Sequence, residues 1–278
     1  MSVESYLATV QRMVQWAIRD INRLIARVDM TDPDAARDAL QAELPTLISV
    51  WGEAAATVAA EYFEELIDAP AVLADPVDSE VVEGMVGWAV GPLYGELAPR
   101  VDENGEPVLD DSGEPIVDKI PPDPAKAQRN ILGASQRHIQ DTGRNTIRYS
   151  AENTPGVGWA RVLRGEENCA WCVVMASRGA VFQSRQTASM VSSKDPIAAA
   201  AHLTHNHCDC DILPIRDDSD YPPGYNVGKY YDQYLEARKR AGIKDVKGGK
   251  DSRGIGLKNI PDSEKDILQL MREIHGMH

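Results

Sequence analysis

All four cysteines of this 278-residue chain lie in two short stretches. The first is CAWC at residues 169–172, and the second is HNHCDC at residues 205–210, which adds two of the six histidines. Cys-x2-Cys is the knuckle spacing of structural zinc sites, because a tight turn lets both sulfurs converge on one tetrahedral ion. The distant pair in the second stretch completes a set of four ligands. The spacing therefore predicts a zinc site that staples a small domain, so that metal binding contributes folding free energy.

The second stretch leaves the ligand set partly open. Its two cysteines are separated by one residue, and alternate residues of an extended strand lie on one face, which is a less usual arrangement than Cys-x2-Cys. We expect one zinc ion, with His205 as the first substitute ligand and His207 as the next. The predicted primary ligands are Cys169, Cys172, Cys208 and Cys210.

Other chemistries use cysteine in similar patterns. A redox dithiol needs a βαβ context and a helix that starts at the first cysteine, and ENCAWCVVMASRG is compatible with such a helix. A zinc deaminase places His-x-Glu before its Cys-x2-Cys, and no His-x-Glu precedes Cys169. A Cys/His nucleophilic enzyme is a poor match, since no cysteine stands apart from the cluster. The same clustering disfavours four unrelated core cysteines.

The net charge of −14 divides the sequence in two. Residues 1–150 hold 26 acidic and 12 basic side chains, whereas residues 151–278 hold 17 of each. The acidic half repels phosphate, so general nucleic-acid binding is disfavoured there. No stretch approaches the roughly 18 consecutive apolar residues that cross a bilayer, and the N-terminus lacks a secretory signal pattern. We therefore expect no membrane partner and a cytoplasmic setting, where thiols stay reduced.

The acidic half has the pattern of long helices. Near the N-terminus, apolar residues spaced alternately three and four apart form a heptad seam: Leu7, Val10, Val14, Ala17, Ile21, Leu24 and Val28. An intramolecular bundle explains this seam more simply than an intermolecular coiled coil. Three further helices are expected, from Pro33 to Leu66 with a break or kink at Pro45, from about 78 to 97, and from 123 to about 149. Residues 1–154 are therefore predicted to form an antiparallel helical bundle.

Residues 101–118 interrupt the helices with an acidic repeat, in which GEPVLD is followed eight residues later by GEPIVD. Asn104-Gly105 and Ser112-Gly113 are turn signals between short β-prone runs, so a small meander is one interpretation. A disordered loop is the other, since so few apolar residues bury little surface. In either form the segment is expected to project.

The linker ENTPGVGW precedes the cysteine region, and we place a domain boundary near residues 154–158. WARVL then has the pattern of a strand. We expect residues 155–242 to form a small zinc-stapled α/β domain, and residues 243–278 a basic flexible tail that ends in a short amphipathic helix capped by Ser263. The predicted fold class is α+β.

The cysteine region resembles the MuF-like minor capsid or head morphogenesis proteins of tailed phages, which are related to phage Mu protein F. The resemblance is carried by WARVLRGEENCAWCVVMASRGAVF and HLTHNHCDCDILPI, over roughly residues 158–216, and is closest to the actinobacteriophage members. Many relatives have His-Pro-Asn-Cys-Arg-Cys there. This sequence has Asn206 and His207 before the cysteine, so either His205 or His207 corresponds to the family's histidine. The matching positions are Cys169, Cys172, Arg178, Gly179, Phe182, His205, Cys208, Cys210 and Pro214.

The resemblance implies a structural protein, present in few copies and associated with the portal during head assembly. Its implied partners are the portal protein, the major capsid or scaffolding protein, and packaged double-stranded DNA through the basic tail. Its implied locations are the capsid interior or portal vertex of the virion, and the host cytoplasm during assembly. Packaging or ejection with the DNA is part of that expectation.

No enzymatic activity is expected, since the 68 residues after Cys210 are few for a catalytic domain and no Ser-His-Asp set or phosphate-binding glycine loop is present. The alternative is a zinc-stapled DNA-binding or DNA-processing protein. Its support is residues 236–258, where eight Lys/Arg stand against three acidic residues. Such a run is more often a solvated tail.

Overall fold

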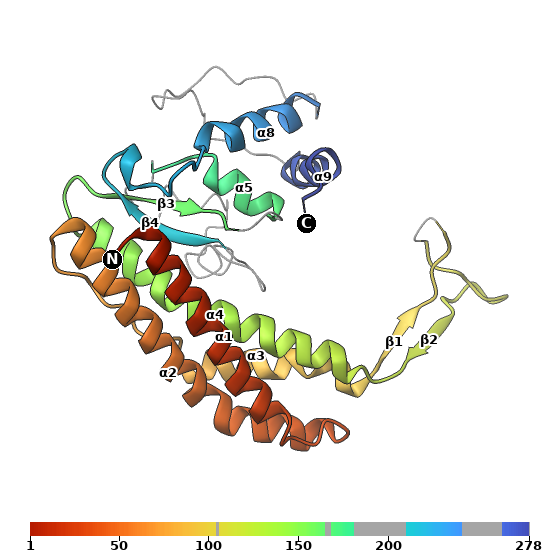
Figure 1. Cartoon of the computed structure of the whole chain (residues 1–278). Coiled ribbons are helices and arrows are strands. Elements are labelled where there is room, and N and C mark those ends of the chain that lie inside the picture. The colour runs from red at the N-terminus through yellow and green to blue at the C-terminus, as the bar shows by residue number, and fades with distance from the viewer. Residues whose placement is uncertain (104–105, 165–167, 181–209, 241–262, 278) are drawn as a thin grey trace.

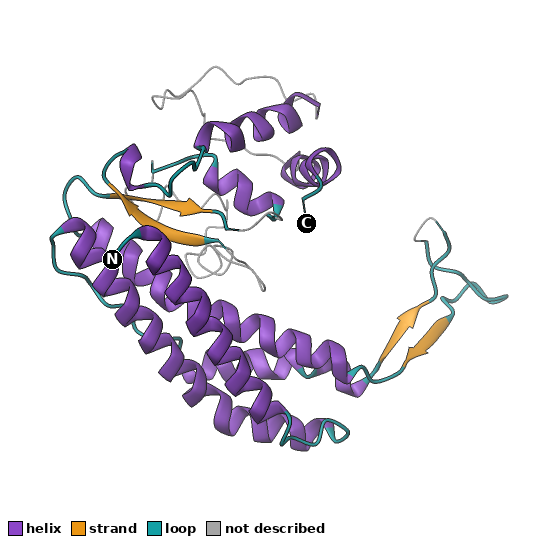
Figure 2. Ribbon diagram, in the orientation of Figure 1, coloured by secondary structure: helices purple, strands orange, loops and turns teal. Residues whose placement is uncertain are grey.

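The computed structural model describes residues 1–278 except 104–105, 165–167, 181–209, 241–262 and 278, and in the last helix it describes side chains from Ile267 onward. The fold is α+β: long helices pack side by side, and two small antiparallel sheets lie at opposite ends of them (Figures 1 and 2). The described elements are α1 (Val3–Ile25), α2 (Pro33–Ile67), α3 (Ser79–Ala89), the 3-10 helix η1 (Gly91–Tyr94), β1 (Glu96–Pro99), β2 (Val117–Ile120), α4 (Pro124–Glu152), β3 (Gly158–Val162), α5 (Ala170–Ala176), β4 (Asp211–Ile215), the 3-10 helix η2 (Asp218–Asp220), α8 (Val227–Arg240) and α9 (Ser263–His275).

The heptad seam of α1 is used inside the molecule. Five of its members are buried. The two end members, Leu7 and Val28, are partly buried, each against one of the two core clusters that α1 joins. The seam packs against α2 and α4 of its own chain, as Figure 1 shows. The predicted intramolecular bundle is confirmed. In the described part of the chain, no helix is long and apolar enough to cross a bilayer.

The helix starts follow the capping signals in the sequence. Asp32 accepts a hydrogen bond from the Ala35 N–H at 3.1 Å at the start of α2, and Asp123 accepts one from the Lys126 N–H at 2.8 Å at the start of α4. Each satisfies a backbone donor that has no partner within its helix. The aspartate-proline pairs therefore mark both starts correctly.

Pro45 does not break α2, so of the two predicted outcomes, a break or a kink, the break is wrong. The helix runs through it for 35 residues. A proline inside a helix costs about 3 kcal/mol, because a hydrogen bond is lost and the ring clashes with the preceding turn. Leu44 and Ile48 are completely buried on either side of Pro45, and their packing in the bundle core offsets that cost.

The third helix is shorter than predicted. It ends at Ala89 instead of continuing to residue 97, and η1 and β1 follow it. Gly91 and Pro92 explain the difference, since glycine weakens a helix and proline has no N–H to continue one. The chain leaves the bundle at this point.

Helices α2 and α4 approach each other closely at two glycines, one on each helix. A Cβ atom on Gly143 would lie 3.0 Å from the Ala55 carbonyl oxygen, and one on Gly52 would lie 3.0 Å from Thr142 Oγ1. Both distances are tighter than ordinary van der Waals contact. The missing side chains therefore set the spacing of this helix pair.

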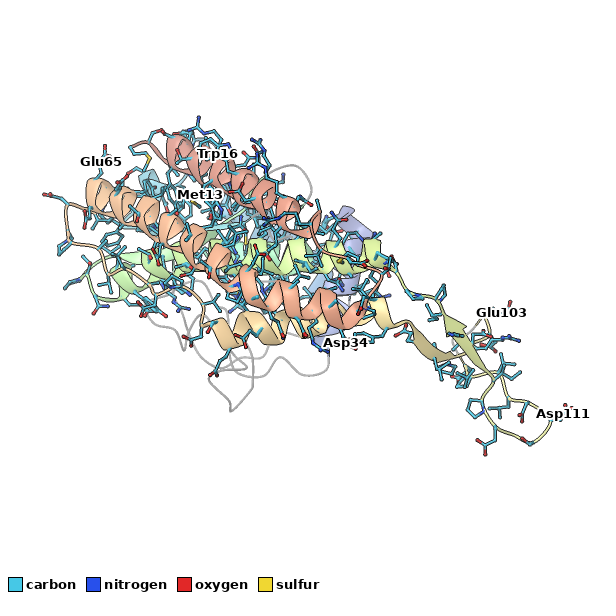
Figure 3. All side chains as sticks on the ribbon, turned by 90° about the horizontal axis from the view of Figure 1, so that it is seen from below. Met13, Trp16, Asp34, Glu65, Glu103 and Asp111 are labelled. Carbon is cyan, nitrogen blue, oxygen red and sulfur yellow. The ribbon has the colours of Figure 1, made fainter. Side chains whose placement is uncertain are left out.

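Residues 96–120, which we call the arm, project from the end of the bundle (Figure 3). Strands β1 and β2 pair with Pro99 opposite Val117, and isolated bridges join Val101 to Pro107 and Leu109 to Pro115. The acidic repeat is also a repeat of structure. Asp102 and Asp110 each accept a hydrogen bond from the backbone N–H four residues later, at 3.0 and 3.1 Å. These described residues follow the meander interpretation.

The second sheet packs against the other end of the bundle. One core cluster joins Tyr6 of α1, Ile147 of α4, Trp159 of β3 and Leu213 of β4. At the expected boundary, residues 154–158, the chain changes from helix to strand, but one hydrophobic core includes residues from both sides of it. The bundle and the cysteine region are packed as one body along this side.

Helix α9 covers the cysteine region together with α5 and α8. Ile267 and Met271 are buried in a cluster that also contains Val173 and Tyr234. A helix of 13 residues is marginal alone in water, so this packing supplies its stability. The predicted terminal helix is confirmed. The part of the predicted flexible tail that precedes this helix, residues 243–262, lies outside the described residues.

Candidate metal centre

The first two cysteines lie at the start of α5. Cys169 is the N-cap residue, and its sulfur accepts a hydrogen bond from the Cys172 N–H at 3.2 Å. Both side chains are buried. The helical turn brings them to one side of the helix start, as the knuckle spacing predicts.

The third described cysteine arrives from a distant part of the sequence. Cys210 immediately precedes β4, is buried, and its sulfur lies 3.6 Å from that of Cys172. Two sulfurs bound to one tetrahedral zinc at about 2.3 Å are about 3.8 Å apart, whereas disulfide sulfurs are about 2.05 Å apart. The spacing of this pair fits two ligands of one ion.

The rest of the predicted ligand set lies outside the described residues: Cys208, His205 and the alternative His207. Within the described ranges, no group of three or more His, Cys, Asp or Glu side chains is placed to hold a metal ion. The structure therefore brings together part of the predicted site. The zinc staple itself stays a prediction.

The surroundings of α5 also bear on the redox alternative. A helix does begin directly after the first cysteine, as in redox dithiols. The adjoining strands β3 and β4 are antiparallel, with Val162 opposite Asp211, so the described sheet is not a βαβ unit. This context disfavours a thioredoxin-like dithiol.

Buried arginines surround the end of β4 where Cys210 lies. Arg144 of α4 donates to the Cys210 carbonyl oxygen, and Arg161 of β3 donates to the Cys210 sulfur, with 2.6 Å between Nη1 and Sγ. Their side chains are only 2% and 1% exposed. Burying a guanidinium is costly unless it is paired, so these contacts fix both groups around one cysteine.

Asp211 balances part of this charge. Arg164 Nη2 lies 3.0 Å from Asp211 Oδ2, and Arg144 Nε lies 4.0 Å from Asp211 Oδ1. Burial raises the pKa of Asp211, and the guanidinium groups of Arg164 and Arg144 oppose that shift. Arg164 also donates to the Leu7 carbonyl oxygen at 3.0 Å, so the network reaches α1.

Sequence reasoning missed these arginines. Arg144 and Arg148 lie on α4 and are buried, 2% and 3% exposed, and nothing in their spacing distinguishes them from an exposed arginine of that helix. Arg161 carried a usable signal, because it interrupts the apolar strand WARVL, and a charge there needs a buried partner. Of the other motif residues, Arg178 is buried and Gly179 has a φ of 59°, while Phe182 lies outside the described residues.

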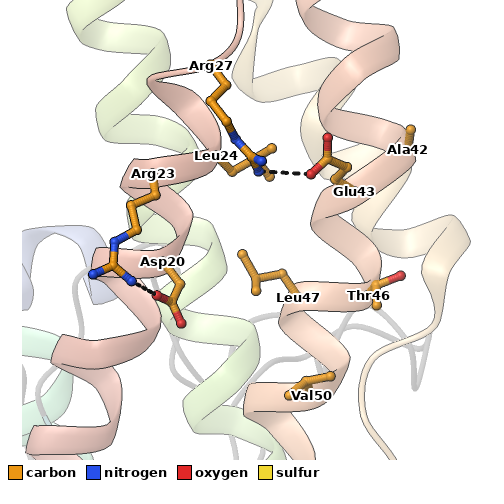
Figure 4. Close-up of a pocket in the computed structure, with 9 residues that line it drawn as sticks. All are labelled: Asp20, Arg23, Leu24, Arg27, Ala42, Glu43, Thr46, Leu47 and Val50. Atoms are coloured by element: carbon orange, nitrogen blue, oxygen red, sulfur yellow. Dashed lines mark hydrogen bonds and ion pairs between the residues drawn. The ribbon is translucent and has the colours of Figure 1, made fainter.

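A groove between α1 and α2 is the other candidate site (Figure 4). It encloses about 630 Å³, with Leu24, Leu47 and Val50 along it. Its charged groups are already paired: Arg23 lies 2.8 Å from Asp20, and Arg27 lies 3.0 Å from Glu43. The groove therefore offers a ligand apolar surface but little polar recognition.

Comparison with known proteins places the chain in a phage family. Residues 1–237 match the family model described as VG15 protein, so the chain belongs to this family. It is 25% identical over 140 residues to the Gene 15 protein of Mycobacterium phage D29, covering 42% of this chain and 51% of that protein. The Gene 15 protein of Mycobacterium phage L5 is also 25% identical, over 129 residues, 36% of this chain and 44% of that protein.

The chain spans about half the length of these curated relatives. No solved structure is significantly similar to it. The family and the relatives together make this a phage protein with an α+β fold.

Proposed function

We propose that this chain is a MuF-like minor head protein, which binds the portal or the inner head surface during assembly and remains in the particle. Membership of a phage family and the motif residues of the cysteine region support the proposal. Its proposed partners are the portal protein and the major capsid or scaffolding protein. Packaged DNA is a further partner for the basic tail, residues 243–278, which follows the basic last turn of α8 with Arg238, Lys239 and Arg240. We propose no enzymatic reaction.

The arm is the observation that carries the proposal. It lies outside all three hydrophobic core clusters of the described residues, so it adds no burial to the fold. It nevertheless exposes large apolar side chains, including Leu97 at 74% and Leu109 at 54%. Between residues 96 and 120 it carries eight acidic and two basic residues. Apolar side chains within a charged frame are typical of a surface that binds and selects another protein.

We also propose a structural Zn²⁺ held by Cys169, Cys172, Cys208 and Cys210, with His205 as the substitute ligand. The 3.6 Å separation of the Cys172 and Cys210 sulfurs supports it. Such an ion would join the start of α5 to the strand that follows Cys210, and its binding energy would stabilise this region. Elemental analysis of protein refolded without added metal tests it. Less than half an equivalent of zinc, with four titrating thiols in the folded protein, counts against the ion.

The arm can be tested without disturbing its fold. Asp102 and Asp110 hold the two turns and stay unchanged. Four other acidic side chains of the arm are replaced by the corresponding amides: Glu103, Glu106, Asp111 and Glu114. Glu103 and Asp111 lie toward the far end of the arm (Figure 3). We expect less of this variant in procapsids and virions, and weaker co-purification with the portal protein encoded by the same genome.

A matched control separates the arm from net charge. It neutralises four exposed acidic residues of the helical region: Glu61, Asp75, Glu80 and Glu83. This control should enter particles at the level of the unmodified protein. Absence of the unmodified protein from procapsids and virions contradicts the assembly role, and equal incorporation of both variants contradicts the role of the arm.

A further inference from the structure

Cys210 is held from two directions by buried arginines. Arg161 contacts its sulfur and Arg144 contacts its carbonyl oxygen, so side chain and backbone are both fixed. Cys169 and Cys172 lie in the local turn that begins α5, where the Cys172 N–H donates to the Cys169 sulfur. The position of Cys210 therefore depends on charged side chains from two other elements, β3 and α4.

The sheet register explains how Arg161 reaches this sulfur. Arg161 pairs with Ile212 across the β3–β4 ladder, and Cys210 stands two residues before Ile212. Residues at diagonal positions of an antiparallel pair share one face and lie within reach of a long side chain. An arginine is long enough for this contact and carries a planar fork of donors.

We propose that Arg161 is a positioning residue of the metal centre, which directs the Cys210 sulfur toward the ion and offsets the negative charge of the thiolate ligands. This inference rests on the proposed zinc site. Four thiolates around one Zn²⁺ leave two net negative charges, and such a group is costly to bury without nearby cations. Arg161 supplies a cation at hydrogen-bond distance from a ligand atom.

Arg144 has a complementary part. It fixes the Cys210 backbone, and through Asp141 at 2.9 Å it is anchored to its own helix, α4. Partners that orient ligands in this way affect metal affinity by roughly 10- to 100-fold when they are removed. The two arginines are therefore expected to matter for metal binding as well as for folding.

The test compares Arg161→Gln and Arg161→Lys in the full chain. Zinc affinity is measured by competition with a chromogenic chelator, and folding by far-ultraviolet circular dichroism. We expect Arg161→Gln to lose roughly 10- to 100-fold in zinc affinity. Arg161→Lys, which keeps the charge, should lose less. If Arg161→Gln does not fold, Arg161→Lys alone decides the outcome.

Cobalt(II) in place of zinc gives a readout that a purely structural role would not change. Loss of the hydrogen bond makes the Cys210 sulfur a stronger electron donor, so the sulfur-to-cobalt charge-transfer band should move to longer wavelength in the folded variants. The matched control is Arg148→Gln, since Arg148 is equally buried on α4 but stacks over the Tyr149 ring, at 4.9 Å. The control should lose stability and keep the band position.

The outcomes distinguish this inference from the proposed metal centre on which it rests. A wild-type chain that binds neither zinc nor cobalt overturns the metal centre, and the role of Arg161 with it. This inference alone is overturned by another outcome. In it the wild-type chain binds zinc, and both Arg161 variants fold, bind zinc within twofold of the wild-type affinity and leave the cobalt band unmoved. Weaker binding with a shifted band in the Arg161 variants, and an unshifted band in the Arg148 control, supports it.

Discussion

Adding one methyl group to Gly143 should destabilise the protein, and adding one to Gly84 should stabilise it. Both glycines lie inside helices, α4 and α3 respectively. The structure gives them opposite surroundings. A Cβ atom on Gly143 would meet the Ala55 carbonyl oxygen at 3.0 Å, and its carbon and Cβ at 3.4 Å, whereas a Cβ atom on Gly84 would meet nothing within 4 Å.

The expected magnitudes follow from two opposing effects. Alanine is more favourable than glycine in a helix interior by about 1 kcal/mol, so Gly84→Ala should raise the free energy of unfolding by about 0.5–1 kcal/mol. At Gly143 the same gain applies, but the contact is with the backbone of α2, which cannot move aside as a flexible side chain can. Overpacking costs about 1–3 kcal/mol or more. We expect Gly143→Ala to lose about 1–2 kcal/mol net.

The assay is urea unfolding followed by far-ultraviolet circular dichroism, with thermal unfolding beside it. A difference of about 2 kcal/mol between the two variants corresponds to about 4–8 °C in Tm for a chain of this size. A stabilised Gly143→Ala, measured together with a stabilised Gly84→Ala, would refute the close approach of α2 and α4. The observed difference would then report helix propensity alone.

Three further outcomes are expected. Burial, together with the nearby Arg137 guanidinium, lowers the pKa of His138 to about 4, so the unfolded chain binds more protons than the folded chain between pH 6.5 and 4. The free energy of unfolding should therefore fall by up to about 3 kcal/mol as the pH is lowered through that window. Urea titration at each pH measures this fall, which should be smaller in His138→Gln. Replacing residues 100–116 by Asn-Gly should change the free energy of unfolding by at most about 0.5 kcal/mol, since the arm joins no core cluster. Cys172→Ala should reduce bound zinc, by elemental analysis, and lower the Tm.

The helical part of the fold could be predicted because its rules are local. A repeat of three and four identifies the buried face of α1, and an aspartate before a proline identifies the starts of α2 and α4. Pro45 is the exception. The local rule predicts a break or a kink. The burial of Leu44 and Ile48 against other helices, which the local rule does not include, keeps the helix continuous.

The cysteine region could be predicted only in part. The knuckle spacing identifies Cys169 and Cys172, and the structure places the Cys210 sulfur against that of Cys172. The arginines could not be assigned in the same way, since Arg144 and Arg129 look alike in the sequence of α4. Only the packing of β4 on that helix distinguishes the buried residue from the exposed one.

This packing also changes what the cysteine region does for the molecule. Arg164 connects Asp211, the residue after Cys210, to the backbone of α1, and Arg144 connects the same strand to α4. Trp159 and Ile147 share one core across the linker. An ion at the cysteines would therefore stabilise the end of the bundle that packs on β3 and β4, as well as the cysteine region itself. The arm emerges at the opposite end of the same helices, so the packed bundle between them fixes the position of the arm relative to the cysteine region (Figure 1).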